Sequence, residues 1–454
     1  MGKLLDPAGK LRPRLGVVVT TWSPESGADF ARRLIDLFPQ TAPGAEVEVV
    51  ACPRMLESEA DVAPIQSYFA DKKLDAVCLI PGNFTLDHVM PLLAQAIRLP
   101  ALLWALPGRE AWGALVAIQQ TVFPFKELGL PYKFVTGKLD DAKVWARALP
   151  FLRACGVVHH LQGLRLGVMG WRAEGMSDVV FDEIALRKTF GIQLVNVGLT
   201  RYTRTLQAIP EDEVQVAWRE ISPVFDTSRL PEKVGLDGAR SYLTLKRLAS
   251  EENLQAVTLE CFHDHLGGPC LGFCLMNDQG IPAPCENDVH AAILMAAGQL
   301  LSGEPTFHAD IVEADYDRNT AVMHHCGNLP LRLAATRPKP GLKPIRETAG
   351  PGASGPTIQA WMKAGPATAV NLVGGAGGLR IAALEGEILA EKVDLPGSGA
   401  LMAFPYDLAA SLEAMGYAGY GHHFVIVTGH IGDELAEWCA LSGVTHWQRE
   451  VAPH

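Results

Sequence analysis

Three short segments, far apart in the chain, carry residue types that bind divalent cations. Glu286 and Asp288 lie directly before a predicted helix. Asp310 stands at the start of a predicted strand, and His423, the second residue of a His-His pair, opens a late strand. Carboxylates plus one imidazole, with water or substrate in the remaining positions, suit Mn²⁺ or Mg²⁺ better than a closed structural zinc site. Together the three segments therefore predict an open divalent metal site.

Each of these residues also has a purely structural interpretation, and the sequence leaves both open. Carboxylates before a helix are favoured as N-caps and by the helix dipole, which would account for Glu286 and Asp288. Asp310 fits an ordinary strand end, and paired histidines at a strand start are often one packed and one solvated ring. The metal-site hypothesis thus depends on whether the three segments meet in space.

A second group of residues that can bind metal ions lies just before Glu286 in the chain. It consists of His263, His265, Cys270, Cys274 and Cys285. The spacing His-x-His followed by Cys-x₃-Cys is not a common structural zinc pattern, and cysteine is also a frequent small buried residue. A cysteine-based zinc site is therefore the less favoured alternative. His263 and His265 stay candidates for additional metal or substrate binding, with an unexplained role.

The glycine run Gly374–Gly378 is like a phosphate-binding loop only in composition. Strand-like residues lie on both sides and no helix follows, so the amide groups of a helix amino terminus are missing. The run therefore predicts a hairpin turn. The first predicted strand, Leu15–Thr20, also ends without G-x-G-x-x-G, so no dinucleotide cofactor is expected.

The elements that must position these residues form three predicted domains. Residues 1–158 and 159–304 each alternate strands with helical patterns, which indicates parallel sheets wrapped by helices, and Glu286 belongs to the second. Residues 305–454 alternate apolar and polar positions between turns, typical of an antiparallel barrel or sandwich, and carry Asp310 and His423. The predicted fold class is α/β, with two successive Rossmann-like α/β domains followed by a β-rich, antiparallel barrel-like C-terminal domain.

The composition argues against several classes of protein. With 50 acidic and 39 basic residues the net charge is −11, which argues against nucleic-acid and membrane partners. The longest apolar runs, such as Ala101–Ala105, are far short of the roughly 18–20 residues of a spanning helix. Met1–Arg14 lacks the apolar stretch of a signal peptide, and nine cysteines spread along 454 residues do not look like a disulfide framework. A cytoplasmic location is expected.

In combination, the three segments resemble the L-fucose isomerase and L-arabinose isomerase family. The points of resemblance, in the family's order, are Ala283–Asp288, a helix ending at Gly303, Phe307–Asp310, His324–Asn328 and Gly421–His423. The separation of 24 positions between Glu286 and Asp310 is also similar to the fucose isomerase pattern. The resemblance is clearest over residues 255–430 and extends more loosely to the whole chain.

The resemblance implies a metal-dependent aldose–ketose isomerase that transfers a proton through a metal-stabilised enediolate. Glu286 and Asp310 match the family's metal-binding carboxylates, which also act as the acid/base pair, and His423 matches the metal-binding histidine. His325 falls near a further ligand of arabinose isomerases, so it is a candidate for additional metal or substrate binding. The expected cofactor is Mn²⁺, with Mg²⁺ or Co²⁺ as alternatives.

The resemblance also implies a homo-oligomer, a trimer or hexamer, with the active site near a subunit interface. The expected partner is a small-molecule sugar, which the sequence does not name, and the base among the two carboxylates is not assigned. Two alternatives stay open. The same metal site could serve epimerisation or carbon–carbon cleavage, or the chain could be a non-catalytic sugar-binding protein, because two linked α/β domains can close on a sugar.

Overall fold

The chain folds into two compact units. One is Leu11–His159, and the other joins Met1–Lys10 to His160–His454. The structure, a computed structural model, describes residues 9–24, 27–262, 267–346, 354–392 and 394–447. It contains two parallel sheets and one large mixed sheet, so the predicted mixed α/β class with a β-rich end is confirmed.

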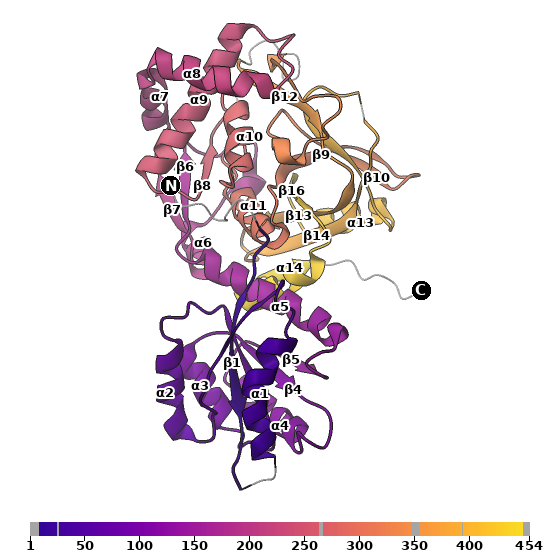
Figure 1. Ribbon diagram of the computed structural model, residues 1–454. Coiled ribbons are helices and arrows are strands. Elements are labelled where there is room, and N and C mark those ends of the chain that lie inside the picture. Colours follow the sequence, from indigo (N-terminus) through magenta and orange to yellow (C-terminus); the bar gives the residue numbers. More distant parts are fainter. Residues whose placement is uncertain (1–8, 25–26, 263–266, 347–353, 393, 448–454) are drawn as a thin grey trace. The chain divides into compact units, whose positions relative to one another are not determined.

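The unit Leu11–His159 contains a five-stranded parallel sheet in the order β2-β1-β3-β4-β5 (Figure 1). Its elements are β1 (Arg14–Thr20), α1 (Ala28–Thr41), β2 (Glu48–Ala51), η1 (Glu59–Asp61), α2 (Val62–Phe69), β3 (Ala76–Pro81), α3 (Val89–Ile97), β4 (Ala101–Ala105), α4 (Ala114–Glu127), β5 (Tyr132–Thr136) and α5 (Ala142–Leu161). Every residue of β3 and β4 is buried. Continuous apolar runs are typical of parallel strands that are covered on both faces.

The other unit begins with a three-stranded parallel sheet in the order β7-β6-β8. Its elements are β6 (Arg165–Met169), η2 (Ser177–Val179), α6 (Glu183–Phe190), β7 (Gln193–Asn196), α7 (Leu199–Ala208), α8 (Glu211–Ile221), η3 (Ser222–Val224), α9 (Glu232–Glu251), β8 (Ala256–Leu259) and α10 (Cys270–Asp278). Helix α9 packs on β8 and also contacts α7, α8 and α10 (Figure 1). This layer supports the chain segment that carries Glu286.

A nine-stranded mixed sheet completes this unit. Its elements are β9 (Phe307–Asp315), β10 (Thr320–His325), η4 (Leu331–Leu333), β11 (Gly341–Pro344), β12 (Pro356–Trp361), β13 (Gly365–Val373), β14 (Arg380–Ile388), β15 (Ser398–Ala403), α13 (Leu408–Tyr417), β16 (His423–Thr428), α14 (Gly432–Ser442) and β17 (Thr445–Trp447). Strands β15-β10-β9-β16-β13-β14 form a ring of antiparallel pairs that the β14–β15 pairing closes. The Gly374–Gly378 run connects β13 to its antiparallel partner β14, so the predicted hairpin turn is confirmed.

Helix α11 (Val289–Ser302) lies between the small parallel sheet and the ring of strands (Figure 1). It contacts β6 and β8 on the one hand and β9, β13 and β16 on the other, and every residue from Val289 to Leu301 is buried. A helix that is almost entirely apolar is stable only in the interior of a protein, and the polar residues His290 and Gln299 of α11 are buried with the rest. Among the described helices, none is both long and apolar enough to cross a membrane. The buried position of α11 fixes the segment that precedes it.

Candidate metal centre

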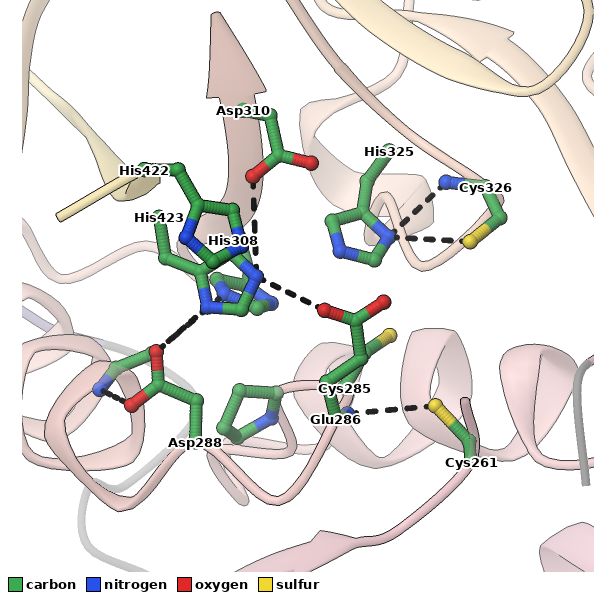
Figure 2. A network of polar contacts seen from close by, with 12 residues as sticks. Cys261, Cys285, Glu286, Asp288, His308, Asp310, His325, Cys326, His422 and His423 are labelled. Carbon is green, nitrogen blue, oxygen red and sulfur yellow. Dashed lines mark hydrogen bonds and ion pairs between the residues drawn. The ribbon is translucent and has the colours of Figure 1, made fainter. Parts of the chain in front are cut away.

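The three predicted ligands meet at the amino terminus of α11, beside the strands β9 and β16 (Figure 2). Asp310 lies on β9, and His423 is its direct partner in the register with β16. Directly opposed residues of an antiparallel pair project to the same face of the sheet. Nε2 of His423 is 2.9 Å from Oε2 of Glu286 and 3.8 Å from Oδ1 of Asp310. The structure therefore brings together one imidazole and two carboxylates from distant parts of the chain.

Glu286 is held in a strained loop. Its φ is 63° and that of Asn287 is 56°, values that are uncommon outside glycine and cost about 1–3 kcal/mol each. The Glu286 N–H donates to Sγ of Cys261 at 3.3 Å, and the Asn287 N–H donates to the carbonyl of Leu259 at 3.1 Å. Both acceptors stand at the carboxyl end of β8. The small parallel sheet therefore positions the Glu286 carboxylate.

Asp288 has two roles, of which the sequence indicated one. Its Oδ1 accepts the N–H of Ala291 at 2.9 Å and so caps α11, as the structural interpretation predicted. Its Oδ2 accepts the Nδ1–H of His423 at 2.8 Å (Figure 2). A carboxylate on one ring nitrogen orients the other nitrogen of a metal-binding histidine. Asp288 thereby directs Nε2 of His423 towards Glu286 and Asp310.

The site is closed around Glu286 and open at Asp310. Only 6% of Glu286 and 7% of His423 are exposed, whereas 31% of the Asp310 side chain is exposed. Burial alone would raise the pKa of Glu286, but the hydrogen bond with His423 and the charges of His325 and His423 lower it to about 2. Burial alone would lower the pKa of His423, but Asp288 and Glu286 raise it well above its ordinary value. At both residues the nearby opposite charges therefore outweigh the effect of burial.

His325, at the end of β10, lies beside these residues. One of its ring nitrogens is in a group with Asp310 and His423 whose ligand atoms all lie within 4.8 Å of one another. Its Nδ1 is contacted by the backbone N–H of Cys326 at 3.0 Å and by the Cys326 sulfur at 3.4 Å (Figure 2). Nε2 has no hydrogen-bond partner among the described residues, and it can bind a cation when the ring carries its proton on Nδ1 and donates it to the Cys326 sulfur.

Sequence reasoning missed two further contributors. His308 is fully buried on β9, and its ring centroid is 4.3 Å from that of His423. His308 and Asp310 are two positions apart on β9, and side chains at this spacing project to the same face of a strand. This spacing could have identified His308 from the sequence. Asp178 accepts hydrogen bonds from Nδ1 of His422 at 2.6 Å and from its backbone N–H at 3.0 Å. Asp178 is 244 positions from His422 in the chain, and no local sequence pattern predicts this contact.

Buried polar atoms without partners gather at this centre. Within the described ranges, no hydrogen-bond partner is found for six such atoms: both ring nitrogens of His308, Nε2 of His325, both side-chain polar atoms of Asn287 and Oδ1 of Asp310. Most buried polar groups are paired in folded proteins, and leaving one unpaired costs about 1–3 kcal/mol. A cation and the oxygen atoms of a substrate would satisfy these atoms. The residues present therefore fit a divalent ion.

The three described cysteines of the alternative zinc group do not form one metal-ligand group. His263 and His265 lie outside the described residues. Cys270 and Cys274 both lie on α10 and belong to none of the metal-ligand groups found in the described part of the chain. Cys285 belongs to a different group, because the segment before α11 turns it towards β9 and β10. Cys270 and Cys274 therefore do not share a metal-ligand group with Cys285.

Comparison with known proteins places the chain near sugar isomerases. The sulfoquinovose isomerases of Priestia aryabhattai and Priestia megaterium are each 24% identical to it over 402 residues, which cover 86% of this chain and 89% of theirs. The sulfoquinovose isomerase of Clostridium sp. strain MSTE9 is 26% identical over 404 residues, covering 83% and 87%. No family model matches the chain. These relatives support a sugar isomerase.

Two solved structures of sugar-binding proteins match the chain only weakly. An ABC transporter solute-binding protein from Agrobacterium vitis with bound D-fucose is 13% identical and covers 64% of this chain and 90% of its own. A periplasmic component of a sugar transport system from Hahella chejuensis is 15% identical, with 64% and 95% covered. Their TM-scores are 0.16 and 0.15, too low to indicate a common fold.

Proposed function

We propose that this chain is an aldose–ketose isomerase that requires a divalent cation, held by Glu286, Asp310 and His423. Mn²⁺ is the proposed ion, with Mg²⁺ or Co²⁺ as alternatives, because the donor set is two carboxylates and one imidazole. One observation carries the proposal: Nε2 of His423 stands between two carboxylates while Asp288 holds its Nδ1. The relatives named above support sulfoquinovose, a glucose with a sulfonate on C6, as the substrate.

The residues around the site can divide the proton transfers of an isomerisation. When bound, a divalent cation would polarise the sugar carbonyl and stabilise negative charge on its oxygens. Glu286, buried and ionised, suits holding the cation. Asp310, at the open side, suits removing the proton from C2 and delivering it to C1. His325 Nε2, which has no partner among the described residues, suits moving a proton between the two sugar oxygens.

Substitution of the carboxylates tests this assignment. Asp310→Asn should lower the rate of sulfoquinovose isomerisation at least about 100-fold, the usual contribution of an acid/base group. Glu286→Gln should lower it as strongly, because it removes a ligand of the proposed cation. The fold should persist, as circular dichroism and thermal unfolding would show. Glu434→Gln is a matched control, because Glu434 is 7% exposed in α14. Wild-type turnover in either site variant would disprove the proposal.

Metal removal and product analysis test the reaction class. A chelator should abolish isomerisation, and Mn²⁺ should restore it. Nuclear magnetic resonance should identify a ketose, whereas an epimer or cleavage fragments would indicate another reaction at the same site. Sugar binding without any turnover would indicate a sugar-binding protein and would contradict the proposed activity.

Assembly and location complete the proposal. We propose a homo-oligomer, trimeric or hexameric, with a subunit interface near the metal centre, and sedimentation analysis tests this. We also propose a cytoplasmic location. All nine cysteines are described and all are free thiols, which fits a reducing compartment.

A further inference from the structure

A group of donors without any oxygen lies next to the carboxylate site. Sγ of Cys285 and one ring nitrogen each of His308 and His325 lie within 4.8 Å of one another. They come from three separate elements, the segment before α11, strand β9 and the end of β10, and are 0%, 0% and 3% exposed. Four-coordinate zinc, with bonds of about 2.0–2.3 Å, spaces its donors about 3.3–3.6 Å apart. Side-chain shifts of about 1 Å would bring the three donors onto one ion.

The surroundings of these donors favour a ligand. In the described part of the molecule, the ring nitrogens of His308 and Nε2 of His325 have no hydrogen-bond partner, although both rings are buried; the carboxylate of Asp288 lies 3.9 Å from Nε2 of His308, beyond hydrogen-bond distance. Buried imidazoles without partners are costly unless something binds them. The sulfur of Cys285 accepts a hydrogen bond from the side-chain amide of Asn328 at 3.3 Å. Outer hydrogen bonds of this kind stabilise metal ligands.

We infer that Cys285, His308 and His325 form a second cation site, selective for thiophilic divalent ions of the Zn²⁺ class. Sulfur and imidazole suit Zn²⁺ and Co²⁺, whereas the carboxylate site suits Mn²⁺ or Mg²⁺. On binding, the cation replaces the thiol proton of Cys285, which passes to the buffer. The two neighbouring sites thus differ in chemical softness: the thiol site favours Zn²⁺ and the carboxylate site Mn²⁺ or Mg²⁺, while Co²⁺ fits either donor set.

His325 belongs to both donor groups. It lies with Asp310 and His423 at the carboxylate site and with Cys285 and His308 at the thiol site. Because Nδ1 contacts Cys326, Nε2 is the nitrogen of His325 left for an ion, and one nitrogen cannot bind two ions at once. A thiophilic ion therefore withdraws His325 from the carboxylate site and inhibits the isomerase. This consequence rests on the proposed function, whereas the second site does not.

Titration of the full chain with Co²⁺ under anaerobic, reducing conditions tests the site directly. A thiolate bound to Co²⁺ gives a sulfur-to-metal charge-transfer band in the near ultraviolet, which oxygen and imidazole ligands do not give. The wild type and Cys439→Ser, a control at a buried cysteine of α14, should develop this band with one equivalent of Co²⁺. Cys285→Ser should lack it, and Glu286→Gln should keep it. Absence in the wild type, or persistence in Cys285→Ser, would overturn the inference.

A second variant and an activity measurement extend the test. His308→Gln keeps the sulfur and should weaken Co²⁺ binding at least about tenfold, and unchanged affinity would contradict a three-ligand site. In the Mn²⁺-loaded enzyme, Zn²⁺ should inhibit Cys439→Ser more strongly than Cys285→Ser, and equal inhibition would contradict the shared role of His325. A wild type without isomerase activity would disprove the proposed function, while the Co²⁺ band would still decide the second site.

Discussion

Replacing Asp288 by Asn separates the two roles of this carboxylate. In the wild type one oxygen accepts the Ala291 N–H at 2.9 Å and the other accepts the Nδ1–H of His423 at 2.8 Å. An amide has a single oxygen and can serve only one of these donors. With the oxygen on the helix, its NH₂ group faces Nδ1 of His423, which must then act as acceptor. The neutral ring then carries its proton on Nε2, the atom that would bind the cation.

The main loss in Asp288→Asn is expected in metal affinity. Removing an outer-shell partner of a ligating histidine typically costs 10–100-fold, or about 1.4–2.7 kcal/mol of binding free energy. Asn ranks with Asp as an N-cap, so the free energy of unfolding of the metal-free protein should fall by only about 1–2 kcal/mol, for the lost charge-assisted hydrogen bond. Asp288→Ala also removes the cap and should cost about 1 kcal/mol more.

Electron paramagnetic resonance of free Mn²⁺ measures the affinity, and urea unfolding measures the stability. Asp407→Asn is the matched control, because Asp407 caps α13 through a hydrogen bond from the Ala410 N–H at 3.0 Å and belongs to none of the metal-ligand groups found among the described residues. The control should bind Mn²⁺ like the wild type. Wild-type affinity in Asp288→Asn would refute the argument that Asp288 sets the tautomer of His423.

Three further changes test other parts of the structure. Gly82→Ala should destabilise the unit Leu11–His159 by about 1–3 kcal/mol in urea unfolding, because a Cβ would lie 2.4 Å from that of Ala31; an unchanged midpoint would show that α1 can shift. Asp75, 2.5 Å from Nδ1 of His159, raises the pKa of that ring, so the pair stabilises the fold fully below about pH 6.5 and loses this contribution as pH rises through the raised pKa. The unfolding free energies of wild type and His159→Gln should therefore converge with rising pH, and a constant difference would exclude the pair as the cause. Asn287→Gly should keep the stability, because glycine accepts a φ of 56°, but should raise KM for the sugar; an unaltered KM would mean that the amide does not contact substrate.

The secondary structure could be predicted largely from local patterns. Apolar runs such as those of β3 and β4 indicate buried parallel strands, because the run itself and the turn residues that flank it are all close together in the chain. The hairpin at Gly374–Gly378 could be predicted for the same reason, since no helix follows it. These features depend on residues only a few positions apart.

Contacts within the centre could not be predicted in the same way. Asp288 and His423 are 135 positions apart, and Asp178 and His422 are 244 apart. Whether such pairs meet depends on the register of β9 with β16 and on the placement of α11, which packing decides. Cys285 illustrates the difference: the less favoured alternative from the sequence grouped it with Cys270 and Cys274, while the fold places its sulfur near His308 and His325.

The sequence by itself determined which residue types were available for chemistry: the carboxylates Glu286 and Asp310, the imidazole of His423 and an excess of cysteine and histidine around them. Only the tertiary structure decided their electrostatic state. Burial removes water from Glu286 and His423, so their mutual charges act at short range and move their pKa values in opposite directions. Residue type is a local property, whereas burial and distance are properties of the whole fold.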